Sequence, residues 1–158
     1  MPQTHQHGYL WTGPKQRFDE EALRRRPHPD PPPPGSRLEL LNRYREVEAA
    51  FHSTDLPPIE TANWLLKPPE MIRGTWTEPK EAASWLRERL TDLLPHFEPG
   101  SLRNAQQLDE AFNSAAERLG WGGDVSLGLY LERPMFLSLA LVTCSPNRAA
   151  PDVLCPVR

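Results

Sequence analysis

The sequence contains few of the residues and motifs that usually indicate a function. Only three of its 18 basic residues are lysines, and 158 residues include just two cysteines. A disulfide between Cys144 and Cys155 would close only a short loop near the C-terminus, so the chain lacks the cysteine framework of a small secreted protein. No phosphate-binding glycine loop and no catalytic signature stands in the sequence, so no class of enzyme is favoured.

Long apolar runs are also missing. The N-terminus has neither the basic start nor the apolar stretch of a signal peptide, and no apolar run approaches the length of a membrane span. A formal net charge of −3 and a pI near 6.0 provide no general attraction to nucleic acid or anionic lipid. We therefore expect a cytoplasmic protein that binds no membrane and selects its partners through local features of its surface.

Proline, in contrast, is abundant and unevenly placed. Eight of the 19 prolines fall within the first 34 residues, and the last six of these lie in the segment 27–34. Such a segment favours extended polyproline II, because each ring fixes φ and removes a backbone donor. We predict a disordered Pro-rich arm over 1–35, in which 17–26 can form a short helix, then a single domain over 36–145 and a tail over 146–158.

The predicted domain begins with a helix over about 37–52. Ser36 and Glu39 have the spacing of a capping box, which satisfies two free backbone donors at a helix start. Apolar residues then recur at steps of three and four, as on one face of a helix. The residues expected to face the core are Leu40, Tyr44, Val47 and Phe51.

Two further helices are predicted by the same periodicity. One runs over about 77–94 with Thr77 as its N-cap, and the other runs from 102 or 104 to 119. Gly120 stands where a left-handed C-terminal cap is expected. Both helices have one apolar side, so both should pack on a common core.

The segment 125–144 reads as a β-hairpin. A two-residue loop at Arg133 and Pro134 would require a positive φ at or next to proline, which the ring forbids. A loop of three or five residues avoids this and is expected to place Leu131 opposite Leu137. The leucines of both strands then lie on one face, where they can cover the helices.

The hairpin requires at least one further strand, because two strands alone are only marginally stable. The segment 71–76 is a candidate third strand, and a strand from a partner is the alternative. The second face of the hairpin is also largely apolar and requires a cover, either from the chain itself or from a partner. The fold class expected is α+β, with about three amphipathic helices packed on a small antiparallel sheet built from the C-terminal hairpin.

Candidate metal ligands are sparse in the sequence. His5 and His7 could contact a metal, but two ligands on a mobile tail do not complete a tetrahedral site, and no cysteine or carboxylate cluster stands beside them. Cys144 is interpreted as a small buried hydrophobe at a strand end. No metal site and no cofactor is therefore predicted.

The function predicted is that of a non-enzymatic interaction or regulatory protein, which binds a protein partner or dimerises through its sheet. Tryptophans beside glycines in loops can anchor a partner, and the second face of the hairpin can dock one. The predicted partner-binding residues are Trp76, Trp121, Tyr130, Phe136, Ala140 and Val142.

Two other functions remain open at this point. The chain can associate with nucleic acid through Arg24, Arg25 and Arg26 on phosphate, although the net negative charge opposes this. It can also be a small enzyme with a pocket between the helices and the sheet, around Trp76 and Trp121.

Overall fold

The computed structural model describes residues 4–99 and 104–157 and shows an α+β fold, as predicted. A four-stranded antiparallel sheet has the order β2-β1-β4-β3. The strands are β1 (His5–Pro14), β2 (Gly74–Trp76), β3 (Val125–Tyr130) and β4 (Met135–Cys144). The α-helices are α1 (Lys15–Phe18), α2 (Glu21–Arg24), α3 (Leu38–Ser53), α4 (Pro79–Leu93) and α5 (Ala105–Gly120), and the 3-10 helices are η1 (Thr61–Leu66), η2 (Pro69–Met71) and η3 (Leu94–His96).

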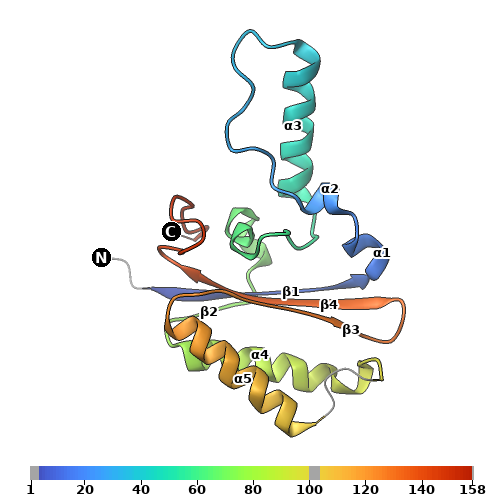
Figure 1. Cartoon of the computed structure of the whole chain (residues 1–158), viewed down its shortest axis with the longest axis vertical. Coiled ribbons are helices and arrows are strands. Elements are labelled where there is room, and N and C mark those ends of the chain that lie inside the picture. The colour runs from blue at the N-terminus through green and yellow to red at the C-terminus, as the bar shows by residue number, and fades with distance from the viewer. Residues whose placement is uncertain (1–3, 100–103, 158) are drawn as a thin grey trace.

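The sheet separates two layers. Figure 1 shows α4 and α5 along one face, while η1 and the C-terminal segment lie over the other face. The start of β1 and the C-terminal segment after β4 lie close together at one end of the sheet (Figure 1). This arrangement brings residues from the two termini into one region.

The N-terminal segment differs from the predicted disordered arm. β1 lies in the middle of the sheet and pairs with β4 along its whole length, from His5 opposite Cys144 to Pro14 opposite Met135. Its segment 9–12 contains aromatic and β-branched side chains, which favour a pleated and buried surface. The proline content of residues 1–35 therefore obscured a strand whose own residues favour the sheet.

The short strand predicted within 71–76 forms as β2, but it pairs with β1 and not with the hairpin. The hairpin itself forms with a register two residues away from the predicted one. Leu129 lies opposite Leu137, and the Leu131 amide donates to the Met135 carbonyl across a loop of residues 132–134. A shift of two residues keeps every side chain on its face, so the leucines still share one side.

The leucine face forms the main core with α4 and α5. Leu137, Leu139 and Leu141 of β4 are fully buried there, together with Leu86 and Leu90 of α4. Burying each such side chain contributes on the order of 1.5–3 kcal/mol. The prediction that the sheet packs on these two helices is confirmed.

The helix caps match the predictions only in part. Asn104 caps α5, since its side-chain oxygen accepts from the Gln107 amide at 2.9 Å. Glu78, and not Thr77, precedes α4, because Pro79 suits the first helical position. Ser36 caps no helix, since its hydroxyl donates to the Pro33 carbonyl and α3 begins two residues later.

Residues of the same chain cover the second face of the sheet. Ala140 and Val142 are buried against Tyr9 of β1 and Trp64 of η1. Phe136 is buried in a separate cluster with Trp11 and Leu56, against which Phe18 of α1 packs. The prediction that Phe136, Ala140 and Val142 are available to a partner therefore needs correction, because β1 and the segments above it fill the place that a partner would take.

Helix α3 has the predicted bounds to within one residue but not the predicted packing. It extends away from the sheet (Figure 1), and only Phe51 at its last turn is buried. Leu40 and Val47 are exposed, although their spacing predicted a core-facing side. Periodicity shows that a helix can bury one face, and here the tertiary structure leaves most of that face uncovered.

Candidate functional site

Four potential metal ligands meet where the two ends of the chain come together. His5 and His7 lie on one face of β1, because side chains two apart in a strand point the same way. Cys144 is the last residue of β4 and lies opposite His5, and Cys155 belongs to the segment after β4. One ligand atom from each residue lies within 4.8 Å of the other three.

The distances in this cluster suit a tetrahedral metal ion. The two Nε2 atoms of His5 and His7 are 3.1 Å apart, and Cys155 Sγ lies 3.5 Å from each of them. A tetrahedral Zn²⁺, with bonds of about 2.0 Å to nitrogen and 2.3 Å to sulfur, separates two nitrogens by about 3.3 Å and nitrogen from sulfur by about 3.5 Å. His5, His7 and Cys155 therefore need little rearrangement to hold such an ion, and Cys144, whose sulfur lies within 4.8 Å of the other three ligand atoms, would complete the set by a small movement.

The surroundings of His7 favour the form of the ring that binds a metal. Thr75 of β2 places its hydroxyl oxygen 2.8 Å from His7 Nδ1, where it can accept a hydrogen bond from the protonated Nδ1 and leave Nε2 free to bind a metal. Burial, together with the neighbouring His5, lowers the pKa of His7 from 6.5 to about 4. His7 is therefore neutral at physiological pH, as a metal ligand must be.

The thiol of Cys144 is held in its protonated form as long as no cation is near. Burial and the neighbouring Cys155 raise its pKa to about 12. A zinc ion reverses this preference, because its charge stabilises the thiolate that binds it. Cys144 is therefore no nucleophile in these surroundings, but it can serve as a ligand that gives up its proton on binding.

Tyr9 completes the surroundings of the two cysteines. It is buried and stacks on Trp64 with ring centroids 4.6 Å apart. Burial and the charges of Cys144 and Cys155 raise the pKa of its hydroxyl, which has no hydrogen-bond partner among the described residues. The hydroxyl of Tyr9 therefore keeps its proton at physiological pH.

The cluster was not found in the sequence because its parts lie at opposite ends of the chain. His7 and Cys155 are 148 residues apart, whereas local metal motifs have spacings of a few residues. The premise that no cysteine accompanies His5 and His7 holds along the sequence but not in space. Two features of the sequence point to this metal site: the two histidines alternate, so they share one face of a strand, and the two cysteines of the chain also lie near a terminus.

The other aromatic residues singled out in the sequence lie apart from this cluster. Trp76 is half-buried and packs beside Trp85 of α4, with ring centroids 5.3 Å apart. Tyr130 is 42% exposed and contacts Phe136 edge to face. Trp121 is 52% exposed and follows the end of α5.

The three arginines proposed as phosphate contacts have different surroundings. Arg24 donates to the carbonyls of Phe18 and Pro57 and lies over the Phe18 ring, so it fastens α2 to the body of the protein. Arg25 pairs with Glu21 at 3.4 Å, and Arg26 is exposed. Arg24 is thus committed to a structural role.

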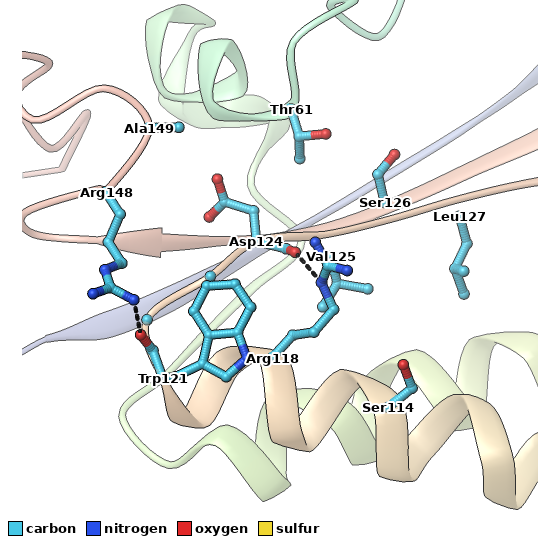
Figure 2. Close-up of a pocket in the computed structure, with 12 residues that line it drawn as sticks. Thr61, Ser114, Arg118, Trp121, Asp124, Val125, Ser126, Leu127, Arg148 and Ala149 are labelled. Carbon is cyan, nitrogen blue, oxygen red and sulfur yellow. Dashed lines mark hydrogen bonds between the residues drawn. The ribbon is translucent and has the colours of Figure 1, made fainter.

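Trp121 lines a hollow of about 450 Å³ between the end of α5, the start of β3 and the segment after β4. Figure 2 shows its indole beside the side chains of Arg118 and Arg148. Trp76 does not line this hollow, so the structure does not bring together the two tryptophans that the predicted enzyme pocket combined.

Comparison with protein-family models, with curated proteins and with solved structures found no match to this chain. Within residues 4–99 and 104–157, no helix combines the length and the apolar character needed to cross a bilayer.

Proposed function

We propose that this chain is a zinc-binding protein, in which one Zn²⁺ bound by His5, His7, Cys144 and Cys155 fastens the C-terminal segment to strands β1 and β4 of the sheet. The observation that supports this proposal is the convergence of four ligand atoms within 4.8 Å of one another. Two of these residues are buried and two are half-buried. Four polar groups rarely converge in such a place unless they share a ligand or a hydrogen-bond network.

The donor set favours zinc over other common ions. Calcium and magnesium prefer oxygen ligands, of which this cluster offers none. Two thiolates and two imidazoles in a tetrahedron are typical of structural zinc. Rieske iron–sulfur clusters also use two cysteines and two histidines, but they bind the histidines to one iron and the cysteines to the other. Here Cys155 Sγ lies 3.5 Å from both histidine Nε2 atoms, which suits ligands of a single ion.

A structural role for the ion follows from its coordination. Four protein ligands leave no open position for water or substrate, in contrast to the three-ligand sites of zinc enzymes. The ion would connect β1 and β4 to the C-terminal segment, whose half-buried Val153 and Cys155 pack over the sheet. The proposed role is therefore to hold the cover of the second face in place, and it requires no catalysis.

A non-enzymatic interaction or regulatory role, the function predicted from the sequence, is part of this proposal. Zinc-held folds without an open metal position commonly present surfaces to other molecules. Of the six predicted partner-binding residues, Trp121 and Tyr130 keep the exposure that contact with a partner requires. The experiment below tests the metal, and recovery of proteins bound to the full chain tests the interaction.

The zinc proposal is tested on the full chain, purified under reducing conditions without added chelator. We expect one zinc per chain by elemental analysis, and thiolate-to-metal charge-transfer absorption after replacement by Co²⁺. Cys155→Ser and His7→Ala should each weaken binding of Co²⁺ by at least about tenfold, since each removes one ligand. His96→Ala is the matched control, because His96 is exposed on η3 and lies outside the cluster.

The result that would overturn the proposal is a folded, reduced chain that takes up neither Zn²⁺ nor Co²⁺ at micromolar concentrations. Circular dichroism on the same samples separates this result from a failure to fold. Unchanged Co²⁺ spectra in Cys155→Ser would likewise remove Cys155 from the proposed ligand set.

A further inference from the structure

The hollow beside Trp121 combines an exposed aromatic surface with positive charge, and the zinc site accounts for neither. Arg118 lies on α5, Trp121 directly after it, and Arg148 on the segment that follows β4. The guanidinium carbons of Arg118 and Arg148 lie 5.8 and 5.7 Å from the indole (Figure 2). Cations at such distances from a tryptophan ring are attracted to its π-system.

The indole is held in place although half of it is exposed. A Cβ atom added to Gly123 would lie 2.5 Å from the Trp121 ring, so the ring rests directly on the Gly123 backbone. Gly122 has a positive φ of 88°, which forms the turn that brings the ring there. The position of the Trp121 ring thus depends on two successive glycines and two flanking arginines.

The charge in the hollow is not cancelled by ion pairs. Arg118 and Arg148 form none with the carboxylates of residues 4–99 and 104–157. Each donates one hydrogen bond to a backbone carbonyl, Arg118 to Asp124 at 3.1 Å and Arg148 to Trp121 at 2.8 Å. These bonds orient both guanidinium groups and leave further N–H donors for a ligand, since each group has five.

Asp124, the acidic residue that lines the hollow, is hydrogen-bonded to residues of β4 and of the segment after it. Its carboxylate accepts hydrogen bonds from the Thr143 amide at 2.8 Å and from the Asn147 side chain at 3.0 Å. These contacts connect the start of β3 to the end of β4 and the segment beyond it. The carboxylate is thereby directed toward its partners on the sheet (Figure 2), and it forms no ion pair with either guanidinium group, although the charge of Arg118 acts to lower its pKa.

From these observations we infer that the hollow binds a small molecule in which a phosphate or carboxylate is attached to a planar ring. The ring would stack on Trp121, and the anionic group would accept hydrogen bonds from Arg118 and Arg148. A volume of about 450 Å³ lies within the range of small-molecule sites. A net charge of −3 opposes a polynucleotide, which needs many phosphate contacts, more strongly than it opposes a small anion held by two arginines.

The inference is tested by NMR titration of the full, zinc-loaded chain with two probes that carry the two kinds of anionic group. Adenosine 5′-monophosphate supplies a phosphate and indole-3-acetate a carboxylate, so the preferred probe identifies the source of the charge. We expect one of them to bind with a Kd below about 1 mM and to shift the Trp121 indole signal. Adenosine and inorganic phosphate alone should each bind at least about tenfold more weakly, since each lacks one half of the contact.

Variants identify the residues responsible. The affinity for the preferred probe should fall about tenfold in each of the variants Arg118→Gln, Arg148→Gln and Trp121→Leu. Arg43→Gln, on the exposed side of α3, should leave this affinity unchanged. The inference fails if neither probe binds with a Kd below about 1 mM, or if the three variants bind as the unmodified chain does. Tighter binding of a single-stranded oligonucleotide than of either probe would also overturn it, in favour of nucleic acid. Zinc content, measured on the same samples, shows separately whether the metal proposal holds.

Discussion

Acid should release the proposed zinc ion steeply, because its affinity is linked to a proton on Cys144. The pKa of this thiol in the metal-free protein is about 12, so the thiol carries its proton throughout the range from pH 6 to 8. Zinc binds the thiolate, so each ion that binds must displace that proton. The apparent affinity therefore falls about tenfold for each pH unit, or about 100-fold from pH 8 to pH 6, through Cys144 alone.

His7 does not add to this dependence. Its pKa is lowered to about 4, so its Nε2 is already free of a proton over the whole range from pH 6 to 8. Any proton displaced from Cys155 adds to the proton displaced from Cys144, which makes the value of tenfold per pH unit a lower limit. The structure thus predicts a steep dependence caused by thiols and not by the buried histidine.

The measurement is a competition for zinc between the protein and a coloured chelator whose affinity is known at each pH. Titrations at pH 6, 7 and 8 and constant ionic strength give the slope directly. Calorimetry in two buffers of different ionisation enthalpy counts the released protons independently. An affinity that does not change between pH 8 and pH 6, or less than about one proton released at pH 7, would refute Cys144 as a ligand.

Three further predictions concern the support of the site and the stability of the fold. Thr75→Val should weaken zinc binding by about 10–100-fold, with one ion still bound at saturation, because it removes the oxygen that orients His7. Competition titration measures the affinity, and an unchanged affinity would contradict this prediction. Burial lowers the pKa of Lys67 from 10.5 to about 8, so the unfolded chain binds more protons between these values and the free energy of unfolding should rise with pH there. Urea denaturation at several pH values should show this rise as a difference between the unmodified chain and Lys67→Met, because the raised pKa of Cys144 acts in the opposite direction above about pH 9. Leu139→Ala should lower the free energy of unfolding by about 2–5 kcal/mol, because Leu139 is fully buried. Leu38→Ala, on the exposed start of α3, should change it by less than about 0.5 kcal/mol. Equal effects of the two substitutions would contradict the assigned core.

The elements predicted most accurately are those with local signals. Helices α4 and α5 and the hairpin follow from spacings within about 20 residues, and their leucines pack as predicted. The hairpin register differed by two residues, because the loop that closes it spans 132–134. The error left the faces intact, since side chains alternate with a period of two.

The largest error concerned β1. The proline content of the first 35 residues predicts a disordered arm that includes residues 5–14, although the segment from Tyr9 to Thr12 has strong β propensity. A central strand obtains most of its stability from neighbours on both sides, and these neighbours come from β2 and β4. Composition averaged over 35 residues cannot reveal such pairing.

The sequence by itself determined the α+β class, the positions of the main helices and the leucine face of the hairpin, because periodicity acts over a few residues. Only the tertiary structure decided what covers the second face, that α3 remains exposed, and that His5 and His7 meet Cys144 and Cys155. These outcomes depend on contacts between segments up to 150 residues apart, such as that between His5 and Cys155. A metal site assembled across such distances is a property of the folded chain, since its ligands become neighbours only when β1 enters the sheet.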